Sequence, residues 1–331
     1  MIVVAGEALV DLVGEPDGRY RPVPGGSPAN VAVGLARLGS PTELLARLGT
    51  GVFGALVREH LARNDVGLTH AVQAAEPATL AVVSLDAEGR ASYDFYVTGT
   101  ADWGWTPDEL PRELPKSAVA LCTGSLAVAL APGAAELAKL VRRERDRGQV
   151  TVVIDPNVRP ALLGDRSEAR RVLGRIIEAA DVVKVSDEDL TWLEPADPVE
   201  QVAANWLGGG PALVVVTRGE RGAYAATRHG ATVTVPARPV RLIDTVGAGD
   251  AFTSGLVDAL RRRQLLGGAT ARDRLAGLDA ATLTQVVEDA GLVAAITCGR
   301  RGADPPTASE VAAQRDTAAT SLPADMAEGD T

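Results

Sequence analysis

The chain has 331 residues, 46% of them hydrophobic, which is enough for one large core or for a core with a small appendage. Its formal net charge of −10 argues against a nucleic-acid partner, and no run of about 18 apolar residues could cross a membrane. The first residues lack the basic segment and cleavage site of a signal peptide. Two isolated cysteines, Cys122 and Cys298, and three scattered histidines indicate no disulfide or metal site. Together these features favour a cytoplasmic location.

Apolar segments of strand length alternate with helical patterns along the chain. In chain order we expect a strand at 2–5, a helix at 29–38, a strand at 43–46, a helix at 53–64, a strand at 119–122, a helix at 133–147, a strand at 150–154, a helix at 167–179, a strand at 182–185, a helix at 199–207, a strand at 213–217 and a helical run at 251–260. Continuous Val/Ile/Leu strands between amphipathic helices are typical of a sheet covered on both faces. The predicted fold class is therefore α/β, with a mostly parallel central sheet.

Four segments depart from this alternation. Residues 11–23 and 79–98 carry alternating patterns and polar turns, which predict a small, partly exposed sheet outside the main one. Residues 261–281 are rich in Arg, Gly and Ala and predict a variable loop or an extra helix. Residues 308–331 are rich in Ala, Thr and Asp and are expected to be partly disordered. We therefore expect one domain over residues 1–307 and a separate C-terminal segment.

The most informative motif is D-T-V-G-A-G-D-A-F at residues 244–252. Gly247, Ala248 and Gly249 lie at the start of the apolar helical run, where backbone N–H groups and the helix dipole favour an anion. Asp250 lies beside them, where a carboxylate can take the proton of a hydroxyl that attacks a phosphoryl group. Asp is also a common helix cap, so the local pattern leaves a capping role equally open.

The motif resembles the C-terminal signature of the ribokinase-like (PfkB) family of sugar and nucleoside kinases. A second signature of that family, P-G-G-S-P-A-N, is found at residues 24–30. The segments G-E-A-L-V-D at 6–11, D-P-N-V-R-P at 155–160 and K-V-S-D-E at 184–188 are most similar to the fructokinase branch. These matches occur in family order across almost the whole chain.

The resemblance implies a ribokinase-like fold in which the small sheet is a lid that closes over a sugar. It implies ATP-dependent phosphorylation of a primary hydroxyl, with fructose as the first choice of substrate. The residues that it implies for the sugar are Asp11, Gly25, Gly26, Asn30, Asn157 and Arg159. Those that it implies for ATP are Lys184, Thr217, Gly219, Gly222 and Gly249. Without the resemblance, Gly25-Gly26 and the Gly219–Gly222 segment would be interpreted as simple turns. Arg159 could then equally form an ion pair with a nearby acid.

The resemblance also implies cations and a second copy of the chain. The family's metal motif, Asn-x-x-Glu, falls on Ser186 and Asp189, a departure that leaves Asp189 and Glu188 as candidates to organise Mg²⁺ through water. Helix capping by Ser186 explains this pattern equally well. A K⁺ site is implied at the Asp244 carboxylate with backbone carbonyls of Val246, Thr297, Arg300 and Gly302. The family also offers a homodimer formed through the lid.

Three other functions remain open at this point. The substrate could be another sugar or sugar acid, such as 2-keto-3-deoxygluconate, because lid and pocket shape set specificity. The chain could be a non-catalytic sugar- or nucleotide-binding relative, against which the retained Asp250 argues. The motif G-x-G-x-x-G at residues 49–54 would fit a dinucleotide-binding oxidoreductase, but residues 69–77 do not form the expected strand ending in an acid.

Overall fold

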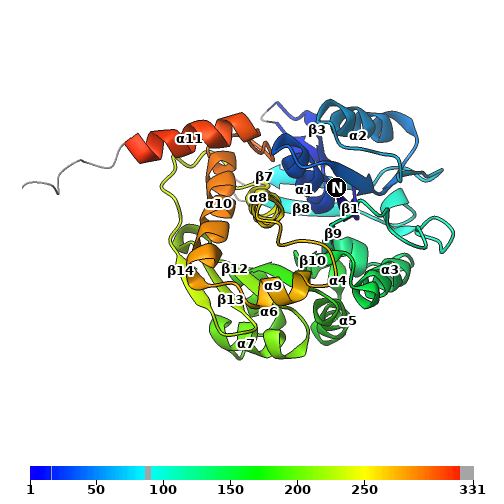
Figure 1. Ribbon diagram of the computed structural model, residues 1–331. Coiled ribbons are helices and arrows are strands. Elements are labelled where there is room, and N and C mark those ends of the chain that lie inside the picture. The colour runs from blue at the N-terminus through cyan, green and yellow to red at the C-terminus, as the bar shows by residue number, and fades with distance from the viewer. Residues whose placement is uncertain (16, 86–90, 321–331) are drawn as a thin grey trace, which may run out of the picture.

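The computed structural model describes residues 1–15, 17–85 and 91–320 (Figure 1). Its largest sheet has eight strands in the order β14-β13-β12-β11-β10-β9-β1-β4. These strands are β1 (Ile2–Ala5), β4 (Thr42–Leu45), β9 (Ala120–Gly124), β10 (Thr151–Asp155), β11 (Val182–Ser186), β12 (Leu213–Thr217), β13 (Ala223–Thr227) and β14 (Thr232–Val235). The six strands from β12 to β4 are parallel, and β13 and β14 extend the edge by antiparallel pairing. The predicted, mostly parallel central sheet is confirmed.

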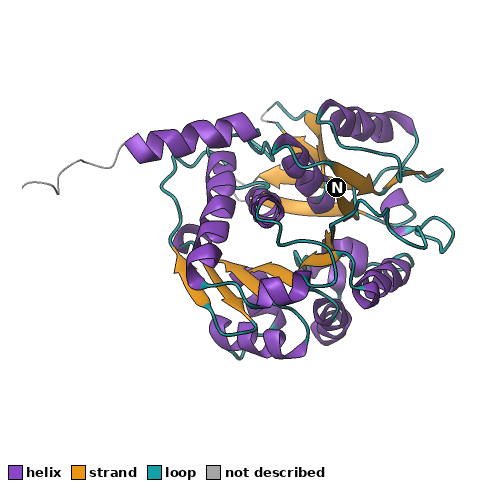
Figure 2. Ribbon diagram, viewed as in Figure 1, coloured by secondary structure: helices purple, strands orange, loops and turns teal. Residues whose placement is uncertain are grey.

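Helices cover both faces of this sheet (Figure 2). One layer contains α1 (Ser27–Arg37), α2 (Gly51–Arg63), α8 (Ala248–Arg262), α9 (Ala271–Ala276) and α10 (Ala280–Cys298), and the other contains α3 (Ala134–Arg147), α4 (Pro160–Leu163), α5 (Arg166–Glu178), α6 (Asp187–Leu193) and α7 (Val199–Gly209). Successive strand residues point to opposite faces. Val153 therefore joins the core under α1 and α8, whereas Val152 and Ile154 join the core under α3 and α5.

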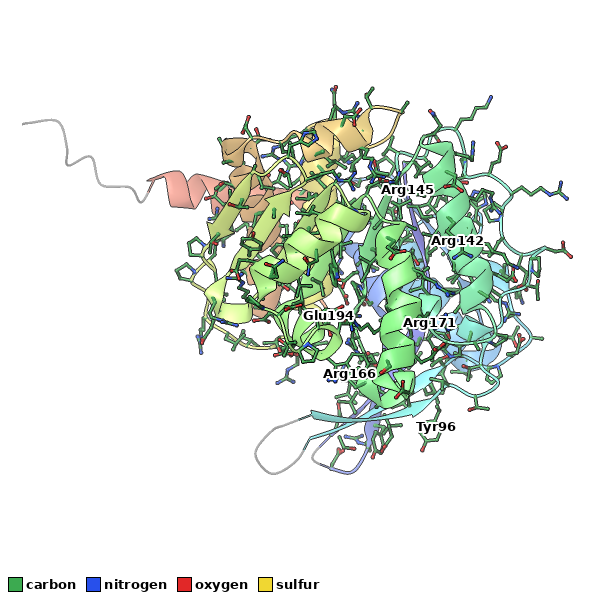
Figure 3. All side chains as sticks on the ribbon, turned by 90° about the horizontal axis from the view of Figure 1, so that it is seen from below. Tyr96, Arg142, Arg145, Arg166, Arg171 and Glu194 are labelled. Carbon is green, nitrogen blue, oxygen red and sulfur yellow. The ribbon has the colours of Figure 1, made fainter. Side chains whose placement is uncertain are left out.

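A second sheet has four strands in the order β3-β2-β7-β8 and is called the lid sheet below. Its strands are β2 (Leu9–Gly14), β3 (Tyr20–Gly25), β7 (Leu80–Leu85) and β8 (Ala91–Tyr96). Strands β2 and β7 pair in parallel at its centre, and the outer pairs are antiparallel. Figure 3 shows this sheet projecting past the end of α5, with Tyr96 on its far side. The predicted second sheet is confirmed, although residues 86–90 of the expected range lie outside the described residues.

Small residues let α8 pack closely between α1 and α10 (Figure 1). A Cβ on Gly34 of α1 would lie 2.4 Å from the Ser254 Oγ of α8, and a Cβ on Gly255 would lie 2.9 Å from the Cα of Ala290 of α10. Larger side chains at these glycines would push the helices apart. The tight packing fixes the N-terminus of α8, which carries the Gly-Ala-Gly motif.

The remaining segments are short or peripheral. The region at 261–281 contains the short helix α9, so the extra helix expected there is present. Helix α11 (Ala308–Thr320) occupies the start of the C-terminal segment, and residues 321–331 lie outside the described residues. None of the helices in the described part of the chain is long and apolar enough to cross a membrane.

The G-x-G-x-x-G motif at 49–54 does not follow a strand of the central sheet. It follows β5 (Arg47–Leu48), which pairs only with β6 (Val72–Gln73) in a separate two-stranded sheet. A dinucleotide fingerprint lies instead at the end of a central strand in a βαβ unit. A Cβ on Gly54 would lie 1.7 Å from the carbonyl oxygen of Gly49, so Gly54 serves the close turn into α2.

Candidate active site

The site lies at the carboxyl edge of the central sheet, near the ends of β1 and β9. From β1 the chain passes through the lid sheet and α1 to β4 on one side, whereas β9 lies on the other side of β1. Ligands of open α/β sheets bind at such a reversal of strand order. A cavity of about 20 Å³ lies here, lined by residues of β1, β9, β10, α1 and α8. That volume suits a single water molecule.

The predicted cradle lies at the N-terminus of α8. Gly247 is the N-cap residue with φ +76°, and a Cβ on it would lie 2.5 Å from the Ala303 Cβ, so only glycine fits this turn. The first N–H groups of a helix have no partner inside it. The N–H of Ala248 donates to the Thr245 carbonyl at 3.1 Å. The Ala248 N–H is therefore engaged within the turn, and the anion cradle at Gly247, Ala248 and Gly249 stays a prediction.

Asp250 is held by the first turn of a different helix. Its Oδ1 accepts a hydrogen bond from Ser27 Oγ at 2.6 Å, and its Oδ2 accepts one from Asn30 Nδ2 at 2.8 Å. Because Gly247 occupies the N-cap position, Asp250 does not cap α8. Burial raises the pKa of Asp250, the charge of Asp155 adds to the rise, and the bonds from Ser27 and Asn30 oppose it. The result is an oriented carboxylate with raised proton affinity.

A buried ion pair supports the cradle from below. Lys184 Nζ lies 2.9 Å from Asp155 Oδ2, and both side chains are buried. Thr253 Oγ1 lies 3.0 Å from the same carboxylate oxygen and 3.0 Å from the Gly249 carbonyl oxygen. A Cβ on Gly249 would lie 3.2 Å from Lys184 Nζ, so the ammonium group lies next to the cradle. The predicted ATP residue Lys184 thus adds positive charge where an anion would bind.

Asp155, Thr123 and Thr253 were not predicted as site residues. Asp155 Oδ1 and Thr123 Oγ1 are buried and have no hydrogen-bond partner within the described residues. Both residues line the small cavity, where one water molecule could satisfy them. Ser27 was also missed, although it belongs to the second family signature.

Asp11 on β2 brings a second carboxylate to the site from the lid sheet. A Cβ on Gly25 would lie 2.3 Å from Asp11 Oδ2, so glycine is needed on the paired strand β3. Burial is the main reason that the pKa of Asp11 is raised to about 6; the charge of Asp250 adds to the rise, and Arg159 opposes it. Asp11 therefore lies close enough to Asp250 and Arg159 for both charges to affect its pKa.

Glycine is also required where the lid joins the body. Gly26 has φ +97°, and a Cβ on it would lie 2.7 Å from the carbonyl oxygen of Glu7.

Asn157 and Arg159 follow β10, and Asn157 has the left-handed φ of +39°. Arg159 donates to the Val158 carbonyl at 2.9 Å, and its charge lowers the pKa of Asp189 as well as that of Asp11. Its positive charge thus opposes the rise in pKa of both carboxyl groups.

The predicted ATP turn follows β12. Thr217 ends this strand, Gly219 begins the 3₁₀ turn η3 (Gly219–Arg221), and a Cβ on Gly222 would lie 2.0 Å from the Val235 carbonyl oxygen. The segment before the Gly-Ala-Gly motif carries exposed apolar side chains at Leu242 and Ile243. Apolar surface beside a phosphate cradle is suited to an adenine ring.

The acids after β11 differ in their surroundings. Ser186 Oγ accepts from the Asp189 N–H at 3.0 Å and so caps α6, as the alternative interpretation predicts. Glu188 is exposed, whereas burial raises the pKa of Asp189 and the charge of Asp155 adds to the rise. Within the described residues no group of three His, Cys, Asp or Glu side chains could hold a metal ion. The charges of Asp155, Lys184 and Arg159 affect the pKa of Asp189, the less exposed of the two Mg²⁺ candidates. Because no such group of side chains surrounds it in the described part of the chain, a magnesium ion would contact Asp189 through water.

Asp244 joins two loops beside the cradle. Its Oδ1 accepts from the Val246 N–H at 3.0 Å, and its Oδ2 accepts from the Gly302 N–H at 2.7 Å. Arg300 pairs with Glu310 at 2.5 Å and with Asp304 at 3.5 Å, so its positive charge is balanced by these acids and not by Asp244. The carbonyl of Thr297 accepts the Arg300 N–H at 2.9 Å. A carboxylate fixed by backbone groups, with carbonyl oxygens nearby, is a donor set suited to a hard cation.

Comparisons with known proteins agree with this geometry. A family model described as pfkB family carbohydrate kinase matches residues 1–310. A fructokinase of Klebsiella pneumoniae is 37% identical over 262 residues, which is 78% of this chain and 84% of that protein. The crystal structure of a fructokinase from Xylella fastidiosa with bound ATP has a TM-score of 0.87 at 28% identity and covers 96% of this chain and 98% of its own. A fructokinase double mutant from Vibrio cholerae O395, in a fructose, ADP and potassium ion bound form, has a TM-score of 0.79 at 28% identity and covers 94% of this chain and 97% of its own.

Proposed function

The chain belongs to the pfkB family of carbohydrate kinases and has the ribokinase-like fold, and on that premise we propose that it transfers the γ-phosphoryl group of ATP to a primary hydroxyl of fructose. The observation that carries the proposal is the position of Asp250. Ser27 and Asn30 fix its carboxylate beside the glycine cradle, and its charge contributes to the raised pKa of Asp11.

The sugar enters between the lid sheet and the body. Asp11 accepts hydrogen bonds from sugar hydroxyls, and Arg159 donates to sugar or phosphate oxygens. Asn30 is bonded to Asp250, so its first task in this arrangement is to orient the base. Gly25 and Gly26 leave room for Asp11 and for the turn that joins the lid to α1.

ATP places its γ-phosphate at the N-terminus of α8. The N–H groups of Gly247 and Gly249 and the ammonium group of Lys184 stabilise the charge on the transferred phosphoryl group. Asp250 orients the attacking hydroxyl and takes its proton as the bond to phosphorus forms. Mg²⁺, when bound, would screen the phosphate charge, and Asp189 is the residue that we expect to contact its waters.

Fructose is preferred because fructokinases of Klebsiella pneumoniae, Rhizobium leguminosarum bv. trifolii and Zea mays are 37%, 34% and 33% identical to this chain. The alternatives are 2-keto-3-deoxygluconate, another sugar, or binding without catalysis. A coupled assay of ADP release with fructose, glucose, ribose and 2-keto-3-deoxygluconate separates them. We expect the highest kcat/KM with fructose; sugar binding without ADP release would identify a non-catalytic relative.

Removing the hydroxyl that bonds Asp250 should shift the pH profile of the reaction. The bond from Ser27 lowers the pKa of Asp250, so Ser27→Ala should raise this pKa further. Because Asp250 acts as a base only when ionised, the acid limb of the kcat profile should move upward by about 0.5–1 pH unit. Ser309→Ala, at an exposed helix start, is the control and should leave the limb in place. An unchanged limb in Ser27→Ala would show that this bond does not tune the base.

K⁺ should activate the enzyme through Asp244. A cation there would fix the turn at Val246 and Gly247, so kcat should rise more than the sugar KM falls. Rates are compared in Tris buffer with KCl, NaCl or tetramethylammonium chloride at equal ionic strength. Equal kcat with K⁺ and tetramethylammonium would contradict a cation site at this carboxylate.

The outer strands of the lid sheet are the surface that we assign to a homodimer. Strands β3 and β8 form its two edges and carry the exposed side chains of Tyr20 and Tyr96 (Figure 3). Unpaired edges and exposed aromatic side chains favour association with another copy. Light scattering from the intact chain distinguishes a dimer from a monomer.

A further inference from the structure

The buried side chain of Asp102 lies where the lid sheet joins the body. Chain segments enter or leave the lid before β2, after β3, before β7 and after β8. The last of these leads into the 3₁₀ turn η1 (Ala101–Trp103), which contains Asp102. The Asp102 side chain is buried, with only 1% of the residue surface exposed.

Asp102 holds the start of the central lid strand β2. Its Oδ1 accepts the N–H of Ala8, the residue before β2, at 2.8 Å. Thr79, the residue before β7, lies nearby and opposes the rise of the Asp102 pKa, and its hydroxyl shares a hydrogen bond of 2.6 Å with the Thr100 hydroxyl. The Thr79 carbonyl in turn accepts the Val10 N–H at 3.1 Å, so the two strand starts are also joined to each other.

Asp102 is itself anchored to the body by its neighbour Ala101. The N–H of Ala101 donates to the Pro77 carbonyl at 2.9 Å, and its carbonyl accepts from Arg47 Nη1 at 2.7 Å. Arg47 is a buried residue of β5 that pairs with Glu76 at 3.3 Å and Glu109 at 3.1 Å. Asp102 thus connects this buried network to the lid sheet.

Burying the Asp102 carboxylate at this junction costs free energy of folding. Asp102 Oδ2 is buried and has no hydrogen-bond partner in the described part of the chain, and burial raises the pKa of Asp102 to about 6. An uncharged side chain would cost less to bury. A residue that costs stability and joins the lid sheet to the body is more easily explained by function than by folding.

We propose that Asp102 is a positioning residue for sugar binding, which holds the start of β2 so that Asp11, three residues beyond Ala8, faces Asp250. The inference rests on the proposed kinase function, because it acts through the sugar contact of Asp11. Asp102 itself does not touch the sugar.

Steady-state kinetics of Asp102→Ala and Asp102→Asn test the proposal. The alanine variant should raise the fructose KM by about 10-fold or more, with kcat and the ATP KM within about two-fold of wild type. The asparagine variant should be intermediate, because an amide oxygen still accepts the Ala8 N–H, although less strongly than a carboxylate. A purely structural role would instead lower kcat through lost active enzyme and leave the fructose KM unchanged, and that result overturns the proposal.

Hydrogen exchange provides a second readout that needs no substrate. In Asp102→Asn the amides of Ala8 and Thr79 should exchange faster than in wild type, while those of β10 stay protected. Equal exchange overturns the proposal even if the alanine variant does not fold. Inactivity of wild type on every sugar would count against the proposed function alone. Asp181→Asn is the matched control: Asp181 is a buried acid that accepts the Val152 N–H at 2.9 Å, far from the lid, and its loss should not change the fructose KM.

Discussion

Asp250→Asn should bind fructose and ATP and lose about 10²–10⁴-fold in kcat, the usual loss when a general base is removed. The amide has the same shape: its one oxygen can still accept from Asn30 Nδ2, and its NH2 group can donate to the Ser27 hydroxyl, but it cannot take the proton of the sugar hydroxyl. The other carboxylates near the cradle have other bonds, since Asp155 is paired with Lys184. The measurement is kcat by coupled ADP release, with titration calorimetry for both ligands.

Asp258→Asn on the same helix is the matched control for this variant. Asp258 is buried two turns further along α8 and pairs with Arg261 at 3.0 Å and Arg262 at 2.8 Å. Its replacement should lower the melting temperature and leave kcat nearly unchanged, the opposite pattern to Asp250→Asn. An Asp250→Asn variant that keeps more than about a third of the wild-type kcat would remove Asp250 from the role of base.

Asp11→Asn should raise the fructose KM by about 10- to 100-fold and leave the ATP KM within about two-fold, because a charged acceptor contributes about 1.5–3 kcal/mol to a hydrogen bond. The lid position of Asp11, paired with Val23 of β3 and Ala81 of β7, explains why only the sugar should be affected. Asp94→Asn, on the exposed side of the same lid sheet, is the control and should change neither constant. Equal losses for fructose and ATP would contradict a sugar-specific role.

The same variant should be more stable than wild type at neutral pH. The pKa of Asp11 is raised to about 6 in the folded chain from an unfolded value near 3.8. The ionised carboxylate therefore disfavours the folded state, by up to about 3 kcal/mol above pH 6 and by little below pH 4. Melting temperatures should favour Asp11→Asn at pH 8, and the difference should shrink as the pH falls from 6 to 4. A variant less stable than wild type at pH 8 would show that the carboxylate is not strained by burial.

Local sequence patterns were sufficient to predict the six parallel strands of the central sheet. The strands at 2–5 and 213–217 were predicted to the residue, because short apolar runs between turns leave few alternatives. The antiparallel strands β13 and β14 were not predicted, since their alternation is short and follows the turn at Gly222. Helices α10 and α11 were also missed.

The site was predicted only in part, because its bonds join distant segments. The carboxylate of Asp250 was found from the glycine motif, but its contact with Ser27 joins residues 223 positions apart. Thr253 and Asp155 are likewise separated by 98 positions. A hydroxyl in the first turn of a helix and an acid at a strand end are common, and only the fold places them together. The Mg²⁺ candidates were adjacent in sequence, and the structure separates the exposed Glu188 from Asp189.

The most direct test of the proposed phosphoryl transfer is ³¹P NMR of the wild-type chain incubated with ATP, Mg²⁺, K⁺ and fructose. We predict loss of the γ-phosphate signal only when fructose is present, with a new monoester signal that is split by two CH₂ protons, as transfer to a primary hydroxyl requires. The same mixture with Asp250→Asn should show almost no monoester in the same time. ATP that stays intact with fructose, or that gives free phosphate at the same rate without sugar, would contradict the account.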